Sequence, residues 1–133
     1  MSFFQKACLF VAGLTAIGIG AIILVVPHAF YASYDIALGN DVSLLSDVRA
    51  QAANLAVLGA IMFAGIVRPA WSRLSVAAAL TVFLAFPLGR FVGIATDGLP
   101  SAAILTAFGI EIAIAVLCLV AFRPGRANTA LAG

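Results

Sequence analysis

Hydrophobic residues along the chain fall into four long runs that short polar stretches separate. The first run covers residues 7–26 without a single charge, and Pro27 follows it. The other three runs cover residues 50–67, 74–96 and 101–122. An apolar run of about 20 residues can cross a hydrocarbon core of about 30 Å as one α-helix. The pattern therefore predicts an all-α fold, an integral membrane four-helix bundle with antiparallel, up-down topology.

Residues that end or bend helices mark the limits of the predicted spans. Residues 97–100, Asp-Gly-Leu-Pro, form a turn by composition between the third and fourth runs. Pro87 lies inside the third run, where a proline removes a backbone donor and should bend the helix. We expect a single transmembrane domain over residues 1–133, with an outer loop at 27–49 and a disordered tail at 126–133.

The first run has an alternative interpretation as a secretory signal peptide. Lys6 precedes it, and Phe30-Tyr31-Ala32 faintly resembles a cleavage site. The apolar core of a signal peptide spans about 7–15 residues, whereas this run has twenty. We therefore interpret the run as a membrane anchor.

Composition places the chain in the same class. Hydrophobic residues make up 65% of it and charged residues 9%, and the mean hydropathy is +1.22. These values lie far outside the usual composition of soluble domains, so membrane lipids are the expected surroundings. The net charge is +2, but the seven basic residues form no run, so no nucleic-acid partner is expected.

Residues that could hold a metal or a cofactor are scarce. Cys8 and Cys118 stand alone in apolar sequence without a CxxC motif, and His28 is the only histidine. Cysteines in such surroundings behave as small buried hydrophobic residues. We expect no metal, no cofactor and no catalytic residue.

Basic residues are concentrated on one side of the predicted bundle. Arg49 is the only one in the loops of the opposite side, whereas five share the side of the termini: Lys6, Arg68, Arg73, Arg123 and Arg126. Short loops rich in Lys and Arg stay in the cytoplasm. Both termini are therefore predicted to be cytoplasmic.

Four polar residues at or near membrane depth stand out: Arg49, Asn54, Arg90 and Glu111. A charge at the centre of a spanning helix costs roughly 2.5–3.5 kcal/mol on insertion scales, so something must offset that cost. One interpretation is an internal ion pair that fixes helix packing, and the other is a binding or proton-handling site.

Arg90 and Glu111 are the expected partners. The third and fourth helices should pack side by side, and helix geometry places the two residues within roughly 6 Å of each other in depth. Side chains tilt toward the N-terminus of their own helix, so the two should approach each other. Arg49 or Asn54 could add hydrogen bonds from the second helix.

The outer loop opens with His28, Phe30, Tyr31 and Tyr34. Aromatic side chains with polar tips favour the membrane interface, so Phe30, Tyr31 and Tyr34 are interpreted as part of an aromatic belt. The alternative is a lid over the mouth of the bundle, formed by His28, Tyr31 and Tyr34.

Small residues recur at every fourth position in three of the runs, which lets helix backbones approach closely in lipid. The stripes are Ala12, Ala16 and Gly20; Ala52, Ala56, Ala60 and Ala64; and Ala77, Thr81, Ala85, Gly89 and Gly93. They favour a closely packed bundle.

Several short motifs follow one another along nearly the whole chain: Pro27-His28-Ala29-Phe30-Tyr31, Arg49-Ala50, Gly89-Arg90, Asp97-Gly98-Leu99-Pro100 and Glu111. In their order and spacing the chain resembles a bacterial family of four-helix membrane proteins of unknown function, the DUF4345 type, and more distantly the DoxX-like group. The resemblance implies a four-helix fold in the bacterial inner membrane and no agreed activity. Members of the wider DoxX-like group are linked to respiratory quinone chemistry or to the assembly of other membrane proteins.

Three hypotheses of function follow. The first is a non-enzymatic accessory or ligand-binding protein whose outward-facing polar cavity holds a lipid, a quinone or another small amphipathic ligand. The second is a small transporter or channel, formed as a homo-oligomer, that uses Glu111 as a titratable site. The third is a quinone- or lipid-linked subunit of a membrane enzyme. A partner membrane protein is compatible with the first and third hypotheses.

Overall fold

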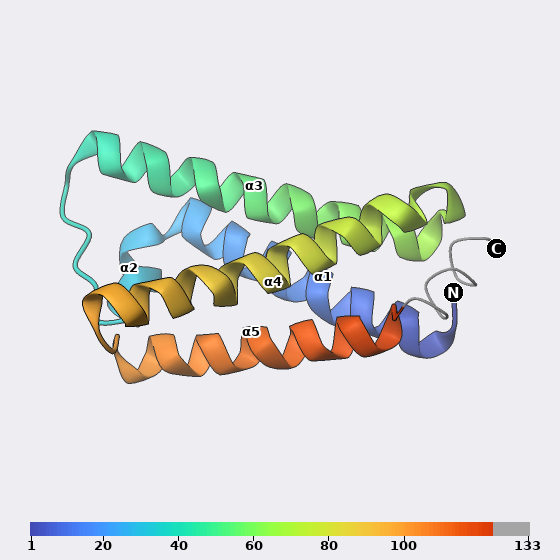
Figure 1. Cartoon of the computed structure of the whole chain (residues 1–133). Helices are drawn as coiled ribbons and strands as arrows, with labels where there is room; N and C mark the ends of the chain where they lie inside the picture. The colour runs from blue at the N-terminus through green and yellow to red at the C-terminus, as the bar shows by residue number, and fades with distance from the viewer. Residues whose placement is uncertain (124–133) are drawn as a thin grey trace.

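The computed structural model describes residues 1–123 and holds four long helices in them: α1 (Phe3–Val25), α3 (Val42–Val67), α4 (Ser72–Asp97) and α5 (Ala102–Ala121). Figure 1 shows them side by side in one bundle, with successive long helices running in opposite directions. The predicted all-α bundle is confirmed. The expected disordered tail at 126–133 lies outside the described residues.

Two short elements join the long helices. The helix α2 (Pro27–Ala32) follows α1 after one residue, and the 3-10 turn η1 (Pro69–Trp71) leads into α4. We call the end of the bundle that holds the N-terminus and η1 the inner end, and the end that holds α2 the outer end (Figure 1).

The four long helices are long and apolar enough to cross a membrane. Many of their large hydrophobic side chains face outward, among them Phe10, Leu84, Phe91 and Leu119. In water such a surface would be unfavourable, whereas in lipid it costs nothing. The chain is therefore a multi-pass membrane protein.

The second span begins earlier than the hydrophobic pattern predicts. We expected the outer loop to continue through residue 49, but α3 starts at Val42. The side chain of Asp41 accepts a hydrogen bond from the backbone N–H of Ser43 at 3.0 Å and so caps the helix. The first turns of α3 are polar, and for that reason hydropathy alone missed them.

Hydrogen bonds at the inner end of the bundle organise the start of α1 and the end of α5. Ser2 and Gln5 form a capping box at the start of α1. The buried side chain of Gln5 also donates from Nε2 to the carbonyl of Ala121 at 2.9 Å. This bond fixes the start of α1 against the end of α5.

The closest helix contact is between α1 and α3. A Cβ added at Gly20 would lie 2.7 Å from the carbonyl oxygen of Ala52 and 2.8 Å from the backbone N of Ala56. No larger residue fits there without moving one of the backbones. The small-residue stripes of these two helices therefore meet at this contact, as the sequence predicts.

The small stripe of α4 behaves differently. Ala77, Thr81, Ala85 and Gly89 are exposed. A Cβ added at Gly89 or Gly93 would meet no atom within 4 Å. The expectation that this stripe packs against a neighbouring helix is wrong for its outer part, because α3 and α4 diverge there (Figure 1).

The packed core lies in the inner half of the bundle. At the inner end Ser75 donates to the carbonyl of Met62 at 2.7 Å, which ties α4 to α3. The other core side chains come from matching depths of all four long helices, among them Leu9, Phe83, Ile114, Cys118 and Phe122. The outer half contributes few buried side chains, and its interior is open.

Candidate functional site

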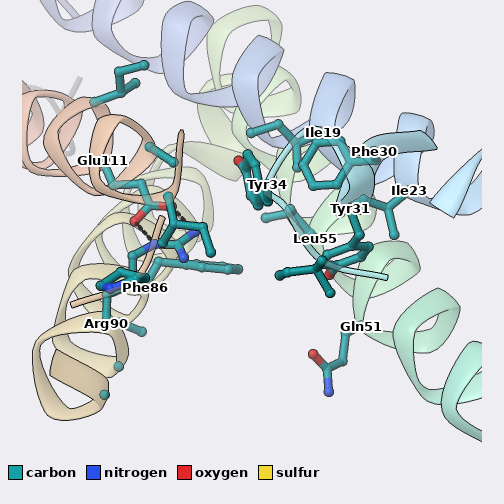
Figure 2. Close-up of a pocket in the computed structure, with 18 of the residues that line it drawn as sticks. Ile19, Ile23, Phe30, Tyr31, Tyr34, Gln51, Leu55, Phe86, Arg90 and Glu111 are labelled. Carbon is teal, nitrogen blue, oxygen red and sulfur yellow. Dashed lines mark hydrogen bonds and ion pairs between the residues drawn. The ribbon is translucent and has the colours of Figure 1, made fainter. Parts of the chain in front are cut away.

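A cavity of about 1100 Å³ occupies the outer half of the bundle. All four long helices line it, together with α2 and the loop that follows. Its volume lies just above the range of about 300–1,000 Å³ that is usual for small-molecule sites. Most of its wall is apolar, with Ile19, Ile23, Leu55 and Phe86 among the lining side chains (Figure 2).

Arg90 of α4 and Glu111 of α5 form an ion pair in the wall of the cavity. Arg90 Nε donates to Glu111 Oε2 and Nη2 donates to Oε1, each at 2.8 Å. The side chains are 23% and 13% exposed, so the pair is shielded but reachable from the cavity. A two-pronged pair of this kind fixes both side chains in one orientation. It also holds α4 against α5 at this depth.

Arg49 and Asn54 do not join this pair. Both are exposed, and neither lines the cavity. Arg49 Nη1 instead donates to the carbonyl of Leu24 on α1. On α3, Arg49 comes directly after the lining residue Val48, and Asn54 comes directly before the lining residue Leu55. Because successive residues of a helix are rotated by roughly 100°, both side chains point away from the cavity. The expected cluster of four polar residues is therefore reduced to two.

Three polar lining residues were not among the predicted candidates: Thr15 of α1, Gln51 of α3 and Asp97 of α4. Gln51 lies on the same face of α3 as the lining residues Val48 and Leu55, at helical spacing of three and four. Asp97 lines the cavity from the end of α4 and is exposed. The helical periodicity of residues 48, 51, 52 and 55 was the signal that would have favoured Gln51 over Asn54.

Three aromatic residues of α2 and the loop after it line the cavity. The ring centroids of Phe30 and Tyr31 are 5.4 Å apart, and those of Phe30 and Tyr34 are 4.9 Å apart. Figure 2 shows Tyr34 on the side of Glu111, and Phe30 and Tyr31 farther from it, near Ile23. The loop carrying them is fixed to α5 because Ser101 Oγ donates to the carbonyl of Tyr34 at 3.0 Å.

His28 takes no part in lining the cavity. Its side chain is exposed, and Nε2 donates to the carbonyl of Gly39 at 2.7 Å. Gly39 has a φ of 71°, a left-handed conformation that favours glycine. His28 therefore anchors the loop before α3, while Tyr31 and Tyr34 lie over the cavity.

The phenol of Tyr34 is neutral at physiological pH. Burial raises its pKa above the ordinary value, and of the neighbouring charges Arg90 lowers it and Glu111 raises it. A protonated phenol can donate a hydrogen bond into the cavity. Tyr34 thus lines the same cavity as Arg90 and Glu111.

Glycines provide part of the cavity volume. Gly89 and Gly93 of α4 line it, and an added Cβ at either would meet no atom within 4 Å. Glycine inside a helix costs roughly 1 kcal/mol relative to alanine. The space they leave is therefore kept open at an energetic cost.

The inner end holds the remaining candidate residues. Cys8 and Cys118 are buried there as free thiols, and Cys8 Sγ lies 3.8 Å from the carbonyl of Leu117. Within residues 1–123, no group of three or more His, Cys, Asp or Glu side chains is placed to hold a metal ion. The polar chemistry of the cavity is thus that of one guanidinium, two carboxylates, an amide, a threonine hydroxyl and two tyrosine hydroxyls.

Comparison with known proteins gives one match. A search of curated proteins found none, and a search of solved structures found none. The family model described as "Domain of unknown function (DUF4345)" matches residues 4–122, which is nearly the whole chain and all four long helices. The chain therefore belongs to the DUF4345 family, whose function is unknown.

Proposed function

We propose that this chain is a non-enzymatic binding protein of the bacterial inner membrane that holds a small amphipathic molecule in its outer cavity. The observation that carries the proposal is the pairing of a large apolar cavity with a single ion pair in its wall. An apolar cavity with a few convergent polar groups is the usual form of a small-molecule site. The ion pair would orient the polar part of the ligand.

The orientation of the chain supports a ligand on the outer side of the membrane. Lys6, Arg68, Arg73 and Arg123 lie at the inner end, and Arg49 lies near the outer end. By the distribution of positive charge, the inner end, which holds the start of α1 and the end of α5, faces the cytoplasm. The cavity is then in the half of the bundle next to the outer leaflet.

A transporter that uses Glu111 as a titratable site is less well supported. Both carboxylate oxygens of Glu111 accept hydrogen bonds from Arg90. A guanidinium that bonds both oxygens of a carboxylate fixes it in one orientation. This arrangement supports an orienting ion pair more than a freely exchanging site.

The test is retention of a ligand by a cavity-filling variant. The full chain, extracted in mild detergent and examined by native mass spectrometry, should carry a bound amphiphile. Gly89→Leu places a side chain in the cavity and should reduce occupancy by about tenfold or more, equivalent to about 1.4 kcal/mol.

Gly109→Leu is the matched control. Gly109 is also a helical glycine with open space at its Cβ, but it is exposed on α5 and does not line the cavity. This variant should retain the ligand. Equal retention by the two variants, or no adduct on the wild-type chain after incubation with lipid, would refute the proposal.

A further inference from the structure

The outer half of the bundle is open between α3 and α4. These helices are tied together at the inner end by Ser75 and Met62 and diverge toward the outer end (Figure 1). Three residues that line the cavity at the two sides of this gap are exposed: Gln51 on α3, and Phe86 and Gly89 on α4. The gap faces sideways, where the surroundings of a spanning helix are lipid.

The ion pair has hydrogen-bonding capacity to spare. The guanidinium of Arg90 has five N–H groups. Two of them are used on Glu111, and no other partner of Arg90 lies within residues 1–123. Each carboxylate oxygen of Glu111 can accept a further hydrogen bond. The pair therefore offers a donor edge and an acceptor edge side by side.

Asp97 adds a second acceptor nearer the outer surface. It lies seven residues after Arg90 on the same face of α4, about 10 Å farther out at 1.5 Å per residue. With Arg90, Glu111 and Asp97 as its charged residues, the lining has one more acidic than basic group. The outer part of the cavity is thus acidic, and the basic group lies deeper.

This charge pattern discriminates among lipid head groups. An anionic head group would place its phosphate on the donor edge but would bring no cation to the excess of carboxylates. An uncharged head group would leave the carboxylate of Asp97 without a cationic partner. A zwitterionic head group places an anion on the donor edge and a cation on the acceptor edge, and breaks no existing pair.

We propose that the cavity opens sideways into the bilayer between α3 and α4 and holds a zwitterionic phospholipid, whose phosphate binds Arg90 and whose ammonium lies toward Glu111 and Asp97. The proposal rests on the ligand-binding function above and names its ligand. The acyl chains lie in the gap and against the apolar wall, with Tyr31 and Tyr34 above them. Entry is from the outer leaflet and not from water.

The experiment measures competition between two head groups. The full chain in detergent is incubated with equal amounts of phosphatidylethanolamine and phosphatidylglycerol that carry identical acyl chains, and native mass spectrometry reports the ratio of the two bound lipids. The zwitterionic lipid should exceed the anionic one by about tenfold, which corresponds to about 1.4 kcal/mol. Preferential retention of phosphatidylglycerol would overturn the proposal.

Charge variants should change that ratio. Glu111→Gln releases Arg90 for an anionic head group and should bring the ratio close to one. Asp97→Asn alters an exposed residue, so the fold should be kept, and the ratio should fall severalfold. Asp35→Asn is the control, because Asp35 is an exposed acidic residue of the outer end outside the lining. Asparagine tolerates its φ of 62°.

The outcomes separate this proposal from the one it rests on. If Gly89→Leu abolishes retention of both lipids but the wild-type ratio is near one, the binding function stands and the head-group inference fails. If Gly89→Leu changes neither lipid, the binding function itself fails. An unchanged ratio in Asp97→Asn and Glu111→Gln would also overturn the inference.

Discussion

The ion pair between Arg90 and Glu111 gives a quantitative test of the outer half of the bundle. Replacing Arg90 with methionine or Glu111 with leucine removes one charge and keeps a side chain of similar size. Each leaves its partner at membrane depth, where an unpaired charge costs roughly 2.5–3.5 kcal/mol. The pair is only 23% and 13% exposed, so water can offset only part of that cost.

The two single variants should differ. A carboxylate left alone can take up a proton and become neutral, whereas a guanidinium keeps its charge. Glu111→Leu should therefore lower the free energy of unfolding more than Arg90→Met. The double variant leaves no charge behind and should cost about 1 kcal/mol or less, because replacing a buried pair by apolar groups is often close to neutral. The coupling energy should then be at least about 2 kcal/mol.

Unfolding in mixed detergent micelles, followed by circular dichroism, measures these free energies. Arg49→Met is the control, because Arg49 is an exposed arginine bonded to a backbone carbonyl, and it should cost less than about 1 kcal/mol. Additive losses in the double variant would refute the reasoning, as would a loss for Arg49→Met equal to that for Arg90→Met.

The other predictions concern topology, the aromatic loop and the inner contacts. A reporter that matures only in the cytoplasm should be active when fused to the C-terminus, and activity of only a periplasm-dependent reporter there would reverse the orientation. Replacing Tyr31 and Tyr34 together with alanine should increase protease cleavage of the outer loop while all four spans stay inserted; loss of insertion would contradict this. Because burial raises the pKa of Tyr34, its contribution to stability is present below pH about 10 and is lost as pH rises further, so Tyr34→Phe should flatten the fall in unfolding free energy on alkaline titration. Gly65→Val should lower the free energy of unfolding by about 1–3 kcal/mol, since an added Cβ would overlap the Ser75 side chain, and a neutral effect would show that the helices can shift.

The sequence predicted the spans and the ion pair for the same reason. Long apolar runs have one stable form in lipid, because the backbone must satisfy its own hydrogen bonds there. Two opposite charges at similar depth on consecutive helices then have a strong reason to meet, and Arg90 and Glu111 do so. Both inferences rest on large free-energy costs, those of unsatisfied backbone groups and of unpaired charges in lipid, and these costs leave few alternative structures.

The details that the sequence did not predict depend on smaller energies. The start of α3 at Val42 is set by one capping carboxylate, and the choice of Gln51 over Asn54 as a lining residue depends on the rotation of a helix. The divergence of α3 from α4 at the outer end depends on how the two helices pack at the inner end. The small-residue stripe of α4 predicts a helix interface that its outer part does not form. Glycine occurs both at close helix contacts and beside open space, and the periodicity of a sequence does not distinguish the two.

The division of the bundle into a packed inner half and a hollow outer half has a consequence for how its sequence can change. At the inner end a substitution such as one at Gly65 or Ser75 must be matched on the facing helix, so assembly restricts the residues allowed there. Around the cavity, positions such as Gly89 and Ile94 face open space or a ligand. Substitutions there change the shape and polarity of the cavity without altering how the helices assemble. Under the proposed binding function, proteins with this bundle can therefore diverge in ligand while they keep one scaffold.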